Sequence, residues 1–227
     1  MSNSRFSILN RAESATLKNG TGGGAPALDQ VSPYTMANAQ TADRRTPWQS
    51  SSGAASFDYD LDLGASRTIS VAALLGLRMV TSESSGTLEV SYTSSYPGGP
   101  WTSIGTQTWA SGARDVGIVL SNTAAGRYWR FTITPDTTQN IVVGRVWLGN
   151  YTNYDLGGMH SPGGISSPFQ NRIEQALEDG SVNINTLGFP GRDFTLPFNT
   201  ASETLRDQLT GVAATSGTVV YIDPEDD

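Results

Sequence analysis

Apolar and polar residues alternate along most of the chain between residues 55 and 148. The clearest example is the stretch 56–64, SFDYDLDLG, in which apolar side chains occupy alternate positions and Asp58, Asp60 and Asp62 lie between them. A period of two is that of a β-strand with one buried face and one solvated face. The stretch predicts a strand whose three aspartates face water, since a one-residue slip in register would bury all three charges.

Six further segments have the composition and pattern of strands: 67–80, 86–94, 101–109, 115–120, 127–135 and 140–149. Turn residues separate them, among them Gly64, the run 97–100 (PGGP) and the pair 135–136 (PD). Short strands at this spacing, without helices between them, predict a mainly β fold, an antiparallel β-sandwich or jelly roll.

The flanking segments differ from this block and suggest four regions. These are an N-terminal segment and loop over 1–47, the sandwich over 48–149, a linker over 150–168 and a small C-terminal assembly module over 169–227. Within the last region, strands are expected at 172–177, 181–187, 191–198 and 218–222. Thr200 and Glu203 fit a capping box, and Leu205 and Leu209 start the apolar stripe of a short helix, so the module is expected to be α+β.

Composition narrows the classes of partner. The 227 residues carry a net charge of -7 and a single lysine, Lys18, which argues against nucleic acid as a partner. There is no cysteine, so disulfides and cysteine-based zinc sites are excluded. The start of the chain lacks the pattern of a signal peptide, and no run of eighteen apolar residues occurs. We therefore expect a soluble chain made in a cytoplasm, without membrane insertion.

No pattern in the sequence predicts a reaction. A calcium loop starting at Asp58 would need glycine at its sixth position and glutamate at its twelfth. The chain has Leu63 and Ile69 at these positions. A solvated strand is therefore favoured over a cation site or an acid/base site. The single histidine, His160, lies in a loop without the spacing of a nucleophile elbow. The glycine-rich run 20–25 lacks the helix that a dinucleotide site requires. We predict no catalytic, cofactor-binding or metal-binding residues, no cofactor and no enzymatic activity.

Aromatic residues in or beside predicted turns are the remaining candidates for binding. Tyr96, Trp101, Tyr151 and Tyr154 are the ones expected to be exposed. Such side chains offer a surface for a glycan or for a protein partner. The alternative interpretation is that they pack on the core and cap strands.

Four short segments follow one another along the chain: 48–51 (WQSS), 58–64 (DYDLDLG), 69–71 (ISV) and 126–131 (GRYWRF). Their order and spacing resemble the discoidin, or galactose-binding-like, β-sandwich family over about residues 45–149. The resemblance implies a galactose-binding-like sandwich. We find no counterpart of the ligand- or calcium-binding loops of sugar-binding relatives, and the disulfide of many discoidin domains is excluded, so a scaffold role is expected.

The wider layout is similar to a group of bacteriophage virion proteins of the tail or adaptor type. The segments that carry this resemblance are 10–12 (NRA), 144–149 (GRVWLG), 163–164 (GG), 191–198 (GRDFTLPF), 202–209 (SETLRDQL) and 219–224 (VVYIDP). The resemblance implies a structural virion protein of the tail, baseplate or adaptor, made in the host cytoplasm. Its partners would be copies of itself in a ring and other virion proteins. The alternative function is a carbohydrate-binding module that recognises host surface glycans.

Overall fold

The computed structural model describes residues 4–7, 9–20, 24–41, 46–51, 53–154, 182–184, 194–196 and 220–222. By its internal contacts the chain divides into two compact units. One is Leu9–Asn150, and the other combines Met1–Ile8 with Tyr151–Asp227. The four regions expected from the sequence stay a prediction.

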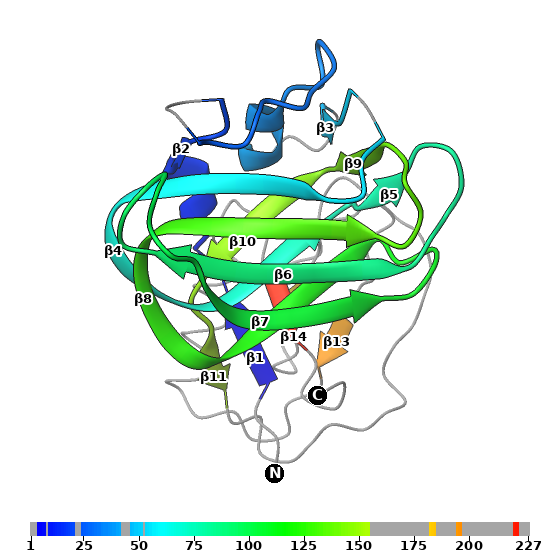
Figure 1. Ribbon diagram of the computed structural model, residues 1–227. Helices are drawn as coiled ribbons and strands as arrows, with labels where there is room; N and C mark the ends of the chain where they lie inside the picture. The colour runs from blue at the N-terminus through cyan, green and yellow to red at the C-terminus, as the bar shows by residue number, and fades with distance from the viewer. Residues whose placement is uncertain are drawn as a thin grey trace. The chain divides into compact units, whose positions relative to one another are not determined.

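The unit Leu9–Asn150 is built on two antiparallel sheets (Figure 1). The larger sheet has six strands in the order β10-β4-β8-β6-β7, with β2 pairing with β4. Its strands are β2 (Thr16–Leu17), β4 (Phe57–Leu75), β6 (Gly86–Thr93), β7 (Thr102–Trp109), β8 (Asp115–Pro135) and β10 (Arg145–Gly149). The smaller sheet has the order β3-β9-β5, with β3 (Trp48–Gln49), β5 (Arg78–Met79) and β9 (Ile141–Val143). Two short 3-10 helices, η1 (Arg11–Ser14) and η2 (Met36–Gln40), complete this unit among the described residues. The predicted mainly β, antiparallel sandwich is confirmed.

Two strands are longer than the sequence predicts. Residues 56–64 and 67–80 were expected as separate strands with a turn at Gly64, but β4 runs through this position, and β8 likewise joins 115–120 to 127–135. Gly64 instead takes a positive φ of 74° within the strand, beside a shift in the β4–β8 register after Asp62. Irregularities of this kind bend a strand without ending its pairing.

Because of these bends, β4 and β8 each contribute one half to one layer of the sandwich and the other half to the second layer. The second half of β8 pairs with β6 and with the first half of β4, whereas the second half of β4 pairs with β10 and with the first half of β8. The two layers meet closely at Gly105 of β7, where an added Cβ would lie 2.8 Å from Ile118 and 2.9 Å from Leu120 of β8. Figure 1 shows the first half of β4, the second half of β8, β6 and β7 side by side in the front layer.

The inward face of β4 is the one predicted. Phe57, Tyr59 and Leu61 are all buried, and the ring of Trp48 packs on Phe57 at 6.4 Å and on Tyr59 at 5.4 Å between centroids. The hydroxyl of Tyr59 donates a 2.8 Å hydrogen bond to the backbone oxygen of Met36, so the buried phenol has a partner. Desolvation by burial raises the pKa of this hydroxyl. The core beside the first half of β4 is therefore rich in aromatic residues.

The other unit contains short strands. β1 (Ser4–Ser7) lies between β11 (Thr152–Tyr154) and β14 (Val220–Ile222), antiparallel to both, and β12 (Val182–Ile184) pairs with β13 (Phe194–Leu196). Strands are therefore found within three predicted segments, 181–187, 191–198 and 218–222, while β11 falls where a linker was expected. The strand expected at 172–177, the capped helix after Thr200 and the loop of His160 lie outside the described residues. Within the described residues, no helix has the length and apolar character needed to cross a membrane.

Candidate functional site

The outer face of the front layer carries a row of paired opposite charges, which we call the charge ladder. Its members are Asp58, Asp60 and Asp62 of β4 and the cations Lys18, Arg127 and Arg130. The register of β4 against β8 places Asp58 opposite Thr132, Asp60 opposite Arg130 and Asp62 opposite Tyr128. The prediction that all three aspartates face water is wrong. The side chain of Asp60 is only 1% exposed and that of Asp62 6%, while Asp58 keeps 28%.

Arg130 holds the centre of the ladder. Its Nε and Nη2 donate to the two carboxylate oxygens of Asp60 at 2.7 and 2.8 Å, and its Nη1 lies 3.2 Å from Oδ2 of Asp58. Asp58 also accepts a 2.7 Å hydrogen bond from the hydroxyl of Thr132. Burial of a carboxylate is tolerable here because a two-pronged, charge-assisted pair replaces its hydration.

Asp62, at the end of the charge ladder, forms hydrogen bonds and an ion pair with different residues. Arg127 donates to its two oxygens at 2.8 and 3.0 Å, the ammonium of Lys18 lies at 3.5 Å, and the backbone N–H of Gly64 donates at 2.8 Å. The Arg127 hydrogen bond is the main reason why the pKa of Asp62 lies below its ordinary value, with burial acting in the opposite direction. The ladder contains three aspartates and three cations, so its formal charges balance.

The loop between β6 and β7 places two aromatic rings over this ladder. Tyr96 stacks on Tyr128 with centroids 5.5 Å apart and planes 29° apart, and Trp101 meets Tyr96 edge-on at 6.3 Å. The guanidinium carbon of Arg130 lies 4.3 Å from the ring centroid of Trp101. We call Tyr96, Trp101 and Tyr128 the aromatic patch.

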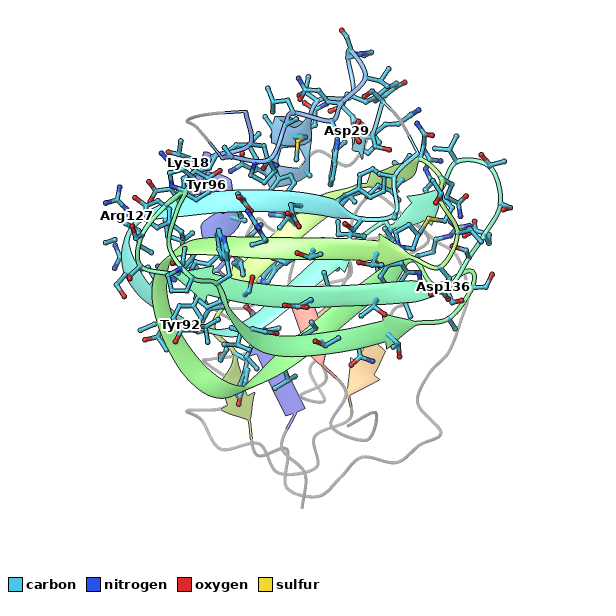
Figure 2. All side chains as sticks on the ribbon, viewed as in Figure 1. Lys18, Asp29, Tyr92, Tyr96, Arg127 and Asp136 are labelled. Atoms are coloured by element: carbon cyan, nitrogen blue, oxygen red, sulfur yellow. The ribbon has the colours of Figure 1, made fainter. Side chains whose placement is uncertain are left out.

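The patch is tied to the edge of the sheet at Lys18. The hydroxyl of Tyr96 donates to the backbone oxygen of Lys18 at 3.1 Å, and Figure 2 shows Tyr96, Lys18 and Arg127 grouped at one end of the sheet. Burial, followed by the negative charge of Asp60, raises the pKa of Tyr96 to about 12. Tyr96 therefore stays a neutral hydrogen-bond donor throughout the ordinary range of pH.

Two polar groups of the patch are unused by the described part of the protein. The indole N–H of Trp101 and the hydroxyl of Tyr128 form no hydrogen bond with any described residue, and both side chains are half-buried. By contrast, the indole N–H groups of three buried tryptophans all donate to backbone oxygens: Trp48 to Asp29 at 2.7 Å, Trp109 to Ser84 at 3.1 Å and Trp129 to Gly126 at 2.9 Å. The patch thus combines packed ring surface with donor and acceptor groups that no described residue uses.

The structure brings together two of the four aromatic residues predicted as contacts. Tyr96 and Trp101 touch in the patch, whereas Tyr151 belongs to the other compact unit and the side chain of Tyr154 lies outside the described residues. That these residues bind a partner or a glycan stays a prediction. Tyr128 was not among the predicted contacts, although the alternating run 127–130 (RYWR) places it on the same strand face as Arg130.

The acidic residues at this site are paired with cations. Among the described residues, no three histidine, cysteine, aspartate or glutamate side chains gather in a way that could hold a metal ion. The predicted absence of catalysis and cofactors stays a prediction, and His160 lies outside the described residues. What the described geometry offers is recognition by stacking and hydrogen bonding.

Comparisons with known proteins give likenesses in structure. No protein-family model matches the chain. No curated protein sequence matches it either. A Ruminococcus gnavus GH29 fucosidase in complex with fucose aligns over 63% of this chain at 17% identity with a TM-score of 0.47; this chain spans only 27% of that protein's length.

Two smaller solved domains align over nearly their whole length. The family 32 CBM of Clostridium perfringens NanJ, in complex with galactose, covers 65% of this chain and 99% of its own at 13% identity, with a TM-score of 0.47. The chitosan-binding module 1 of a Paenibacillus sp. IK-5 chitosanase/glucanase covers 62% of this chain and 98% of its own at 22% identity, with a TM-score of 0.45. At these identities the likeness assigns no ligand to this chain.

The predicted role in a phage virion finds no support in these comparisons. A tail, baseplate or adaptor function, a ring of copies and location in a virion therefore stay predictions that follow from the sequence resemblance alone.

Proposed function

We propose that this chain is a carbohydrate-binding protein whose ligand lies on the aromatic patch. The observation that carries the proposal is a pair of polar groups that form no hydrogen bond with any described residue, the Trp101 indole N–H and the Tyr128 hydroxyl, on rings that the charge ladder holds in place. This was the alternative function that the sequence suggested.

The chemistry of a sugar ring fits such a surface. A pyranose presents C–H groups on its faces, which pack on an aromatic ring, and hydroxyls around its rim, which need both donors and acceptors. Tryptophan and tyrosine supply an apolar body with a polar group at its end. Trp101 offers a donor, the Tyr128 hydroxyl offers a donor and an acceptor, and Asp58 offers partly exposed carboxylate oxygens.

Pre-organisation lowers the entropic cost of binding. Tyr96 and Tyr128 are stacked, Arg130 is fixed by Asp60 beneath Trp101, and the Tyr96 hydroxyl is anchored on Lys18. Side chains that are already immobilised lose little freedom when a ligand arrives. Because the three cations of the ladder are neutralised by three aspartates, we infer a neutral saccharide as the ligand.

A glycan array followed by calorimetric titration with the best neutral oligosaccharide tests the proposal. Trp101→Ala removes the stacking surface and one donor, and is expected to weaken binding at least about tenfold, or about 1.4 kcal/mol. Tyr128→Phe keeps the ring and removes one neutral hydrogen bond, and is expected to cost about 0.5–1.5 kcal/mol of binding free energy. Tyr34→Ala, at an exposed tyrosine on another loop, is the matched control and should leave binding unchanged.

The proposal fails if the wild-type chain retains no glycan on the array, or if Trp101→Ala binds as tightly as the Tyr34→Ala control. Preferential binding of sialylated or sulfated glycans over neutral ones would contradict the inference about ligand charge.

A further inference from the structure

Two asparagine side chains close the edges of the large sheet. At β10, the amide of Asn10 donates to the backbone oxygen of Val146 at 2.9 Å and accepts from the backbone N–H of Leu148 at 3.0 Å. At β4, the amide of Asn19 donates to the backbone oxygen of Asp58 at 2.7 Å and accepts from the backbone N–H of Asp60 at 2.8 Å. In both places one amide satisfies the oxygen of residue i and the N–H of residue i+2, as a neighbouring strand would.

These amides are reinforced by short backbone segments. β2 pairs with β4 through Thr16–Leu17, and the backbone N–H of Lys18 donates to the oxygen of Asp60 at 2.9 Å. η1 and η2 pack against β10. Covering a free edge in this way prevents other strands from pairing with it.

β7 forms the remaining edge, and no described segment covers it. Among the described residues it pairs with β6 alone, and the side-chain hydrogen bond to its backbone comes from within the strand, from the amide of Gln107 to the oxygen of Thr108 at 3.2 Å. The strand is eight residues long, TSIGTQTW, and the side chains of Thr102, Ser103, Thr106, Gln107 and Thr108 are all exposed. Figure 1 shows β7 at the border of the front layer, beyond β6.

The composition of β7 also lacks the residues that discourage pairing, although the strand has one irregularity at Ile104, where its register against β6 shifts between Val90 and Ser91. Natural edge strands carry lysine, proline or inward-pointing charges when they must stay single. In a chain with a net charge of -7, no charged residue occurs from Ser91 to Ala113, and β7 contains no proline. Threonine-rich strands have high β propensity, and hydroxyls opposite each other can form hydrogen bonds across a strand pair.

We propose that β7 pairs antiparallel with β7 of a second copy, forming a two-fold dimer with a continuous sheet. A second copy suits this edge because antiparallel self-pairing is isologous: both strands present the same uncharged edge, and the contact closes with two subunits. We place the two-fold axis perpendicular to the sheet at Thr106, so that Thr106 lies opposite its own copy. The same faces of both sheets, and with them both aromatic patches, lie on one side of the dimer.

The mass of the full-length protein in solution, measured by light scattering over a dilution series, tests this proposal. The wild-type protein is expected at twice the chain mass of 24.1 kDa at high concentration. Thr106→Lys places like charges opposite each other across the axis and is expected to give the single-chain mass. Thr138→Lys is the control: it makes the same substitution at an exposed threonine outside the strands and should remain dimeric.

If Thr106→Lys does not fold, amide hydrogen exchange of the wild-type protein, compared at low and high protein concentration, tests the proposal instead. Exchange of β7 amides is expected to slow as the concentration rises, while amides of β6 keep their rates. A wild-type chain with the single-chain mass at every concentration, a Thr106→Lys variant that folds and stays dimeric, or β7 exchange independent of concentration would each overturn it. Glycan binding by the aromatic patch is measured separately and can stand or fall alone.

Discussion

Replacing Asp60 by asparagine is expected to destabilise the protein by about 2–4 kcal/mol. The wild-type carboxylate accepts two charge-assisted hydrogen bonds from Arg130, at 2.7 and 2.8 Å, and its side chain is only 1% exposed. Asparagine keeps the shape but offers one oxygen, so one bond worth about 1.5–3 kcal/mol is lost and the other becomes a weaker neutral acceptor contact. Its amide also faces an arginine N–H, donor against donor. The estimate reaches the lower end of the cost of breaking a buried ion pair, about 3–5 kcal/mol.

Asp58→Asn is the matched control, because it makes the same change two residues away on the same strand face. Asp58 is 28% exposed and contacts Arg130 through a single 3.2 Å ion pair, so the expected loss is below about 1 kcal/mol. Urea denaturation of the wild-type protein and both variants, followed by tryptophan fluorescence, gives the free energies of unfolding. Equal losses in the two variants would refute the reasoning that burial decides which pair matters.

Two further predictions concern acid stability and packing. Arg127 holds the pKa of Asp62 below its ordinary value, so the stability that this pair provides is present at neutral pH. It is lost as the pH falls below the ordinary aspartate range towards the pKa of Asp62 in the folded protein. Urea titrations at several pH values should show this loss of unfolding free energy in the wild-type protein and a smaller loss in Asp62→Asn. Gly126→Ala would place a methyl 2.6 Å from the Tyr92 ring and is expected to lower the free energy of unfolding by about 1–3 kcal/mol. Gly98→Ala, where an added Cβ has no atom within 4 Å, is the control and should leave it nearly unchanged in the same urea titrations. Equal effects of the two substitutions would contradict the packing argument.

The strands of the sandwich could be predicted because their pattern is local. A period of two identifies the inward residues Phe57, Tyr59 and Leu61 without knowledge of their neighbours, and all three are buried. The continuity of β4 through Gly64 could not be predicted in the same way. A glycine with positive φ is as suitable for a turn as for an irregularity within a strand, and only the pairing with β8 decides between them.

The charge ladder depends on which strand lies beside β4. Alternating aspartates indicate a solvated face when a strand is considered alone, which is why the solvated face predicted for Asp58, Asp60 and Asp62 was wrong. The run 127–130 (RYWR) supplies cations at positions that the register brings opposite Asp60 and near Asp62. Opposite charges on two predicted strands are a signal for their pairing, but the sequence is compatible with several strand orders and the signal alone does not choose between them.

The aromatic patch was predicted in part for a similar reason. Tyr96 and Trp101 stand out as turn aromatics beside a PGGP run, which is local information. Tyr128 sits within a strand and joins them only because the β6–β7 loop lies over β8. A polar group that no described residue bonds, such as the Trp101 indole N–H, can be identified only from the three-dimensional arrangement of the residues around it.

The indole N–H signals of the protein in a ¹H–¹⁵N correlation spectrum test the central claim most directly. The chain has five tryptophans, and four of them, Trp48, Trp109, Trp129 and Trp147, are buried. On titration with a neutral oligosaccharide selected on the array, we predict that the signal of Trp101 shifts and saturates while the other four hold their positions, and that Trp101→Phe removes the moving signal. A saturable shift of a buried tryptophan alone, or a static spectrum at saturating glycan, would contradict carbohydrate binding at the aromatic patch.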